Sequence, residues 1–167
     1  MTTKATRAVP VDLLAHLRRA RDHIDRHYQQ PLDVALLARV AGVSRYHFIR
    51  CFEAAYGDTP IRYLTRRRIE RAQDLLRLAN LTVTEVCMAV GFASLGSFST
   101  RFAELVGETP TAYRNRWAAL GGPRVPGCYL FMRGALDLAG TATPAPPAAP
   151  ETPDRALWEK PAREQSE

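Results

Sequence analysis

The chain has few cysteines, few aromatic residues and no long hydrophobic run. Its three cysteines, Cys51, Cys87 and Cys128, are too few and too widely spaced for a disulfide framework or a four-thiolate zinc site. No segment approaches the roughly 18 consecutive apolar residues of a membrane-spanning helix. The polar N-terminus also lacks the apolar stretch of a secretion signal. These absences predict a small cytoplasmic protein with no metal, no cofactor and no membrane partner.

Acidic residues are outnumbered: 17 Asp and Glu stand against 23 Lys and Arg in 167 residues, a formal net charge of +6. Residues 1–118 contain 18 of the basic and 11 of the acidic residues, and eight of the twelve prolines follow them. A basic surface attracts polyanions such as nucleic acid. We therefore expect a folded basic domain over residues 8–118, followed by a Pro/Ala-rich tail over residues 119–167 that is largely irregular or disordered.

Within this tail, two segments differ in character. Residues 143–153 are too rich in proline for a helix, because proline lacks the backbone N–H and clashes with the preceding turn. Residues 128–132 are apolar, and the sequence leaves three possibilities open for them. They could add a strand or turn to the domain, contact a partner, or remain loose.

Hydrophobic periodicity in the basic unit is helical, and the alternation typical of strands is absent. Apolar spacings of three and four residues predict helices over residues 11–28 and 60–79, with Ile61 among the residues that face inward in the second of these. Two shorter helices are expected between Asp33 and Gly42 and between Ser44 and Gly57, because Asp and Ser favour helix N-caps and glycine favours helix ends. The fold class is therefore all-α.

An internal repeat organises this unit. A shift of 50 residues places six residues of one half on identical residues of the other, and a shift of 49 aligns the preceding segment. The aligned residues are Phe48, Phe52, Gly57, Thr59, Pro60 and Tyr63 with Phe98, Phe102, Gly107, Thr109, Pro110 and Tyr113. In each copy a short helix, a glycine turn and a second helix form the helix-turn-helix pattern, whose second helix enters the major groove of DNA.

The segments around Gly91, Phe102 and 107–114 resemble the second helix-turn-helix of the AraC/XylS family of bacterial transcription regulators. Residues 68–76 resemble the linker helix of that family, and residues 31–52 resemble its first motif. The resemblance implies two helix-turn-helix subdomains joined by a long linker helix, homeodomain-like, with seven helices. It also implies sequence-specific binding of double-stranded DNA and a role in transcription regulation, more often activation than repression.

Helical angles predict which side chains face the DNA. With Phe48 and Phe52 in the core, Tyr46 and Arg50 fall on the opposite side of the first recognition helix. Arginine can bond guanine in a bidentate manner, and the family commonly places its base-reading residues at these two positions. Helix N-termini suit phosphate. The full set of candidates is Ser44, Arg45, Tyr46 and Arg50 in the first motif, with Ser94, Ser97, Thr100 and Arg101 in the second.

The second motif departs from the family pattern, because Thr100 stands where the family often has arginine. Its outward stripe is otherwise Gly96 and Ala103, which offer no side-chain hydrogen bond. Ser97 and Arg101 lie on the flank and could reach phosphate or a groove edge. We therefore expect the first motif to carry most of the sequence specificity and the second mainly to contact the DNA backbone.

Several features have more than one interpretation. The arginines of 66–68 could contact phosphate or pair with nearby acids on a solvated helix face, although Arg68 is expected to fix structure. His23 and His27 have metal-ligand spacing, but solvent-facing histidines explain them better. Cys51 and Cys87 are expected to be buried and inert, without a redox role.

The expected function is that of a regulator that binds DNA as a monomer across two groove segments, with RNA polymerase as a further candidate partner. The segments outside residues 8–118 are too short for a separate effector domain, so the chain resembles the short members of the family. No enzymatic activity is expected. Two alternatives remain: a nucleoid-type protein that binds DNA without sequence preference, and a relative of DNA-alkylation-repair enzymes, which the cysteine count disfavours.

Overall fold

The computed structural model describes residues 10–121 and 124–132. The elements in these residues are α1 (Val11–His27), α2 (Val34–Ala41), α3 (Arg45–Tyr56), α4 (Pro60–Leu78), β1 (Ala79–Asn80), α5 (Val83–Ala89), α6 (Leu95–Val106), α7 (Pro110–Ala119), β2 (Val125–Pro126) and α8 (Gly127–Met132). The predicted all-α class and the seven helices of the basic unit are confirmed. The short helix α8 is an addition to them.

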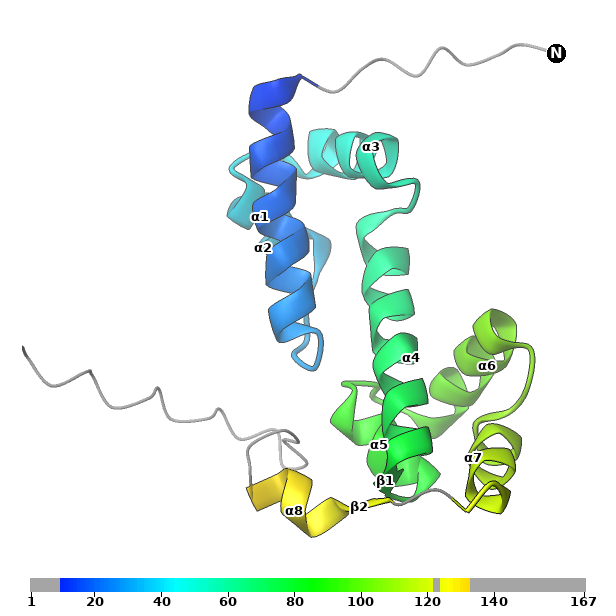
Figure 1. Ribbon diagram of the computed structural model, residues 1–167. Coiled ribbons are helices and arrows are strands. Elements are labelled where there is room, and N and C mark those ends of the chain that lie inside the picture. Colours follow the sequence, from blue (N-terminus) through cyan, green and yellow to red (C-terminus); the bar gives the residue numbers. More distant parts are fainter. Residues whose placement is uncertain (1–9, 122–123, 133–167) are drawn as a thin grey trace, which may run out of the picture.

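The long helix α4 connects two helical units. Figure 1 shows α1, α2 and α3 gathered around one end of α4, and α5, α6 and α7 around its other end. Each unit has its own cluster of buried hydrophobic residues, and α4 contributes to both clusters. At 1.5 Å per residue, the 19 residues of α4 span about 28 Å.

Helix ends in both units use the same local chemistry. Thr59 and Thr109 lie at the N-caps of α4 and α7, where each hydroxyl accepts a hydrogen bond from a backbone N–H three residues later. A proline follows each threonine at the first helical position, where its missing N–H costs nothing. The turn glycine Gly42 has a φ of +67°, a backbone conformation that residues with a side chain rarely adopt.

The core of the first unit joins α1 to the recognition helix. Leu17, Ala20 and Ile24 of α1 are fully buried, as are Phe48 and Phe52 of α3. Complete burial of a side chain of this size contributes about 1.5–3 kcal/mol to stability. The packing therefore fixes α3 through its two phenylalanines and leaves the opposite side of the helix exposed.

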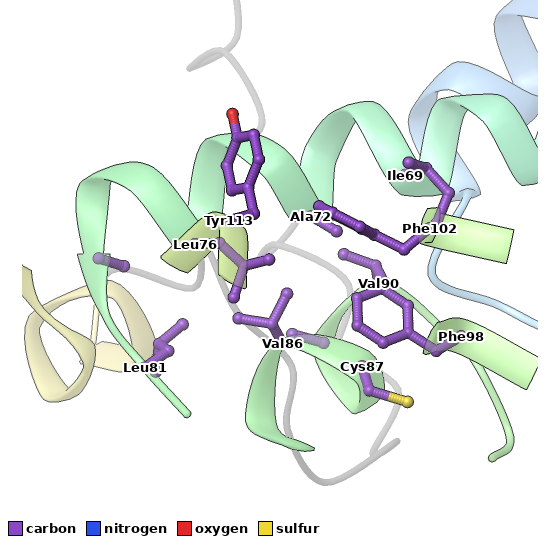
Figure 2. Close-up of a cluster of buried hydrophobic side chains, with 12 residues drawn as sticks. Ile69, Ala72, Leu76, Leu81, Val86, Cys87, Val90, Phe98, Phe102 and Tyr113 are labelled. Carbon is purple, nitrogen blue, oxygen red and sulfur yellow. The ribbon is translucent and has the colours of Figure 1, made fainter. Parts of the chain in front are cut away.

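The second unit repeats this arrangement, with α4 in the place of α1. Ile69, Ala72 and Leu76 have the same spacing along α4 as the buried residues of α1, and they pack with Phe98 and Phe102 of α6 (Figure 2). The sequence repeat thus corresponds to two similar cores. Helix α4 is the last helix that contributes to the first core and the first helix that contributes to the second.

The position of Ile61 differs from the prediction. It was expected to face inward, but it is 41% exposed. At 100° per residue, the α4 face buried by the first unit (Pro60, Leu64) lies roughly 130° from the face buried by the second unit (Ile69 to Leu76). Ile61 lies closer to the second face, but at the end of α4 that the second unit does not cover.

The segment after α7 adds to the second unit, although its apolar run 128–132 lies in helix α8 and not in the strand or turn that the sequence left open. Strands β1 and β2 pair in parallel, with Ala79 opposite Val125. Arg124 donates a 2.6 Å hydrogen bond to the carbonyl of Leu76, and Leu130 of α8 packs against the second core. Residues 125–132 of the tail are thus regular, as strand β2 and helix α8. The proline-rich residues 143–153 lie outside the described residues.

Candidate nucleic-acid interface

The outer surface of α3 presents an aromatic and cationic pair. Tyr46 is 72% exposed, and the guanidinium carbon of Arg50 lies 5.6 Å from the centre of its ring. This distance is within the range of a cation–π contact, which holds the guanidinium without neutralising it. Among the described residues, neither Arg50 nor Arg45 forms an ion pair, although each is exposed. The first motif therefore offers two cations with no competing acid.

The first backbone N–H groups of α3 have no side-chain acceptor at the N-cap. Ser44 lies at the N-cap position, as expected, but its side chain accepts no hydrogen bond from the helix. The predicted N-cap position of Ser44 is confirmed, and the capping bond that a serine hydroxyl often supplies there is absent. Ser44 and Arg45 are both exposed. The hydroxyl and the first amide groups of α3 are consequently available to a phosphate oxygen.

At the N-terminus of α6, by contrast, the N-cap serine forms hydrogen bonds within the helix. The hydroxyl of Ser94 accepts a 3.3 Å hydrogen bond from the N–H of Ser97 and donates a 3.0 Å bond to its hydroxyl. Thr100 is exposed on the outward side. Arg101 forms a 2.7 Å ion pair with Glu104, one turn later. The second motif therefore presents hydroxyl groups and a paired cation, whereas the first presents unpaired cations.

All eight predicted residues are exposed, and the structure groups them by motif. Tyr46 and Arg50 lie together on α3, and Ser94 and Ser97 lie together at the start of α6. Because α3 and α6 belong to different units, the two groups lie on separate helices that are connected through α4 (Figure 1). Exposure is a condition for contact with DNA, and the roles of these residues remain predictions.

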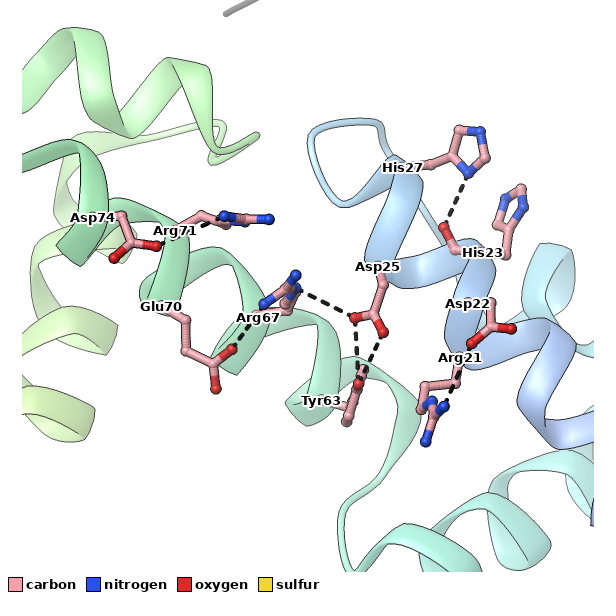
Figure 3. Close-up of polar contacts among 10 residues, drawn as sticks. All are labelled: Arg21, Asp22, His23, Asp25, His27, Tyr63, Arg67, Glu70, Arg71 and Asp74. Carbon is pink, nitrogen blue, oxygen red and sulfur yellow. Dashed lines mark hydrogen bonds and ion pairs between the residues drawn. The ribbon is translucent and has the colours of Figure 1, made fainter. Parts of the chain in front are cut away.

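The three arginines of residues 66–68 all have partners within the described part of the chain. Arg66 pairs with Asp58 at 2.6 Å, and Arg67 pairs with Asp25 of α1 at 3.4 Å. Figure 3 shows that Arg67 and Tyr63 both point toward the Asp25 carboxylate. These contacts favour the interpretation of a helix face paired with acids. They tie α4 to α1.

Arg68 has a different role from its two neighbours. Its Nε donates to the carbonyl of Tyr28 at 2.7 Å, and its Nη2 donates to the carbonyl of Gln30 at 2.8 Å. Burial lowers the pKa of this guanidinium, but arginine remains charged in proteins. The expectation that Arg68 fixes structure is consistent with these two bonds.

The histidines lie in α1 and α3, and the cysteines lie in α3, α5 and α8. The described residues contain no group of three metal-ligating side chains, and no described helix is long and apolar enough to cross a membrane. Cys87 is buried, and burial raises the pKa of its thiol. Cys51 was also expected to be buried but is only half-buried, with its Sγ 3.6 Å from Nε2 of His47. All three cysteines are free.

Sequence reasoning identified Gly91 but missed its contact with the first unit. Gly91, in the turn before α6, has a φ of +84°, and a Cβ built there would lie 2.3 Å from the carbonyl oxygen of Gln29 in the first unit. The equivalent Gly42 has only His16 nearby, at 3.6 Å. Both glycines have the same local sequence signal for a turn. Only the three-dimensional contact separates them.

Comparisons with known proteins agree with this architecture. A family model described as a helix-turn-helix domain matches residues 37–116. The regulatory protein SoxS of Salmonella typhimurium is 31% identical over 93 residues, which are 56% of this chain and 87% of SoxS. A probable AraC family transcriptional regulator from Rhodopseudomonas palustris is 25% identical over 62% of this chain and 97% of the solved chain, with a TM-score of 0.58.

The chain belongs to the AraC/XylS family. A further structural neighbour is the DNA-binding domain of AdpA, a global transcriptional factor, which was solved in complex with a target DNA. It is 32% identical over 64% of this chain and 93% of that domain, with a TM-score of 0.56. Several other regulators that match are much longer, and the matched region spans only 30% to 38% of their length. The similarity therefore covers the two helix-turn-helix units of the family.

Proposed function

We propose that this AraC/XylS-family protein regulates transcription by inserting α3 and α6 into two successive major-groove segments of a specific duplex site. The observation that carries the proposal is the pair of similar units, each with a recognition helix whose outer side is exposed, on one continuous helix of about 28 Å. One turn of DNA is about 34 Å. The similar AdpA domain, which was solved in complex with a target DNA, supports the DNA-binding part of the proposal.

In this proposal the two recognition helices contribute differently. Arg50 bonds a guanine edge, and Tyr46 contacts the neighbouring groove surface, because both lie on the outer side of α3 without an acidic partner. Thr100 is the corresponding group on α6 and offers one hydroxyl. The first motif therefore supplies most of the base discrimination.

The other candidate residues contact the DNA backbone in this proposal. Ser44 and Arg45 lie at the N-terminus of α3, where unpaired amides and positive charge attract phosphate. Ser94 and Ser97 are placed similarly on α6, with their hydroxyls already joined by a hydrogen bond. Arg101 reaches phosphate only by exchanging Glu104 for it. Such contacts fix the position of the protein on the duplex and carry no sequence information directly.

The remaining expectations belong to the same proposal. The protein acts in the cytoplasm as a monomer on DNA, activates transcription through contact with RNA polymerase, and catalyses no reaction. The absence of a metal-ligating group of three in the described residues disfavours a repair enzyme with a zinc–thiolate centre. Its half-buried and buried cysteines, Cys51 and Cys87, are free and lie in different units.

The test starts by selecting bound duplexes from a random DNA pool with the full chain. We expect two short preferred blocks about ten base pairs apart. Fluorescence anisotropy then compares Arg50→Ala, Arg50→Lys and Thr100→Ala on the selected duplex and on single-base variants. Arg50→Ala should reduce discrimination at one guanine by about 5- to 150-fold, the equivalent of about 1–3 kcal/mol for a bidentate contact.

Arg50→Lys is the matched control for charge, because lysine keeps the positive charge but lacks the planar fork. It should retain affinity for random DNA while losing the guanine preference. A greater loss of discrimination from Thr100→Ala than from Arg50→Ala would contradict the assignment of specificity to α3. Equal, salt-dependent affinity for selected and random DNA would favour the nucleoid-type alternative.

A further inference from the structure

The two helix-turn-helix units adjoin at a small junction in the middle of α4. Three segments meet there: the residues 28–30 that follow α1, Arg68 of α4, and the turn that begins at Gly91. The Arg68 guanidinium donates to the carbonyls of Tyr28 and Gln30 at 2.7 and 2.8 Å. Hydrogen bonds from a charged, planar donor to two backbone acceptors restrict both distance and orientation. Arg68 thus holds the segment after α1 against α4.

The same guanidinium also contacts the second unit. Its central carbon lies 5.8 Å from the centre of the Phe92 ring, in the turn before α6. Tyr28 adds a second connection, because it packs against both hydrophobic cores. One arginine and one tyrosine therefore touch both units at the point where they adjoin.

Gly91 allows the two backbones to approach directly. A Cβ at this position would lie 2.3 Å from the oxygen and 2.8 Å from the carbon of the Gln29 carbonyl group. Both are backbone atoms, so no side-chain rotation would relieve the overlap. The equivalent Gly42 of the first turn also has a positive φ but meets only a histidine ring at 3.6 Å. The close approach is therefore a property of the junction and is not needed for a helix-turn-helix turn.

The sequence repeat supports this distinction. The shift of 50 residues that aligns the two units places Ala118 at the position equivalent to Arg68. Only the copy of the helix that has a second unit to position carries the arginine.

We propose that Arg68 and Gly91 are positioning residues that set the spacing between the two DNA blocks the protein accepts. The inference rests on the proposed function. One added base pair moves the second block about 3.4 Å along the duplex axis and about 35° around it. A rigid pair of recognition helices cannot follow that displacement. A protein with a loosened junction tolerates it, because α6 can reorient relative to α3.

The experiment measures affinity as a function of block spacing. Duplexes selected by the wild-type chain are resynthesised with one or two base pairs inserted or deleted between the blocks, and a further duplex keeps only the first block. Wild type, Arg68→Ala, Arg68→Lys, Gly91→Ala and Gly42→Ala are titrated on each, with thermal melting of every variant. For Arg68→Ala, the affinity ratio between the best spacing and its neighbours should fall about tenfold, the equivalent of one hydrogen bond to a charged group.

The control variants separate spacing from simple loss of stability. Gly91→Ala and Gly42→Ala both place a side chain at a positive φ, so both should lower the melting temperature. Of these two glycine variants, only Gly91→Ala should broaden the range of block spacings that the protein accepts. Arg68→Lys keeps the charge without the fork and should behave like Arg68→Ala. Affinity for the single-block duplex should change little in the two Arg68 variants and in Gly91→Ala, because these changes leave α3 and its core untouched.

The outcomes are distinguishable from failure of the proposed function. If the wild-type chain selects two blocks at fixed spacing and the Arg68 and Gly91 variants keep an equally sharp profile, the inference is wrong while the proposed function stands. If the wild-type chain selects no paired blocks, the proposed function and the inference both fail. Should Arg68→Ala not fold, Arg68→Lys and Gly91→Ala still decide between these results.

Discussion

The ion pair between Arg101 and Glu104 predicts that the second motif can be strengthened by removing an acid. In Glu104→Gln, Arg101 loses its 2.7 Å partner and becomes available to a DNA phosphate. Both side chains are more than half exposed, and such surface pairs contribute only about 0.2–1 kcal/mol. The variant should therefore remain folded with nearly unchanged stability, while its affinity for the selected duplex rises.

The size of the effect follows from counterion release. Each phosphate contact adds about 0.9 to the slope of log affinity against log salt, so one new contact increases the loss of affinity between 50 and 200 mM salt by about 3.5-fold. Anisotropy titrations over this salt range measure the slope. The double variant Arg101→Ala, Glu104→Gln should lose the gain, because the cation itself is gone.

A matched control tests whether net charge alone explains the result. Asp74→Asn removes one acid from the exposed surface of α4, where Asp74 pairs with Arg71 and Arg77. It changes the net charge by the same amount as Glu104→Gln. An equal steepening of the salt slope in both variants would refute the argument, since the gain would then come from total charge. An unchanged slope in Glu104→Gln would show that Arg101 does not reach phosphate.

Two further predictions concern stability. Phe52→Ala and Phe102→Ala remove fully buried rings from the two cores, and each should lower the free energy of unfolding by about 3–5 kcal/mol. Because α4 belongs to both cores, Trp117 fluorescence and far-ultraviolet circular dichroism should report one shared unfolding transition in either variant. Two separate transitions would contradict this coupling between the cores. Hydrogen bonds from Thr82 lower the pKa of Glu85, so its contribution to stability is present above the unfolded pKa and is lost as pH falls through the folded pKa. In urea unfolding, the stability of Glu85→Gln should lack this loss at acid pH. The same dependence of stability on pH in the variant and the wild type would contradict the prediction.

The sequence predicted those parts of the fold that depend on local signals. Glycine turns, the Asp33 cap and the threonine–proline pairs set helix ends within a few residues, so the bounds of α1 to α4 follow closely from the sequence. The buried phenylalanines follow from helical spacing, and with them the exposed position of Arg50. These inferences need only the 3.6-residue period of a helix and the chemistry of its ends.

Features that depend on contacts between distant segments could not be predicted in this way. Ile61 is exposed because α4 buries different faces at its two ends, which no single periodic pattern expresses. The close approach of Gly91 to Gln29 joins residues 62 positions apart. By contrast, the ion pair between Arg101 and Glu104 is a local contact within one helical turn, and their spacing of three residues could have predicted it.

The difference between the two recognition helices has a consequence for how specificity arises. If the junction at Arg68 positions α6 as we propose, the binding of α6 is intramolecular once α3 is bound and needs little affinity of its own. Thr100 and the serines of α6 can then be weak contacts and still add selectivity, because they contribute only where a suitable groove lies at the correct spacing. In this proposal the first motif distinguishes DNA sites by their base sequence, and the second distinguishes them by the spacing between the two blocks. Strengthening α6 through Glu104→Gln should accordingly raise affinity more than it raises base discrimination.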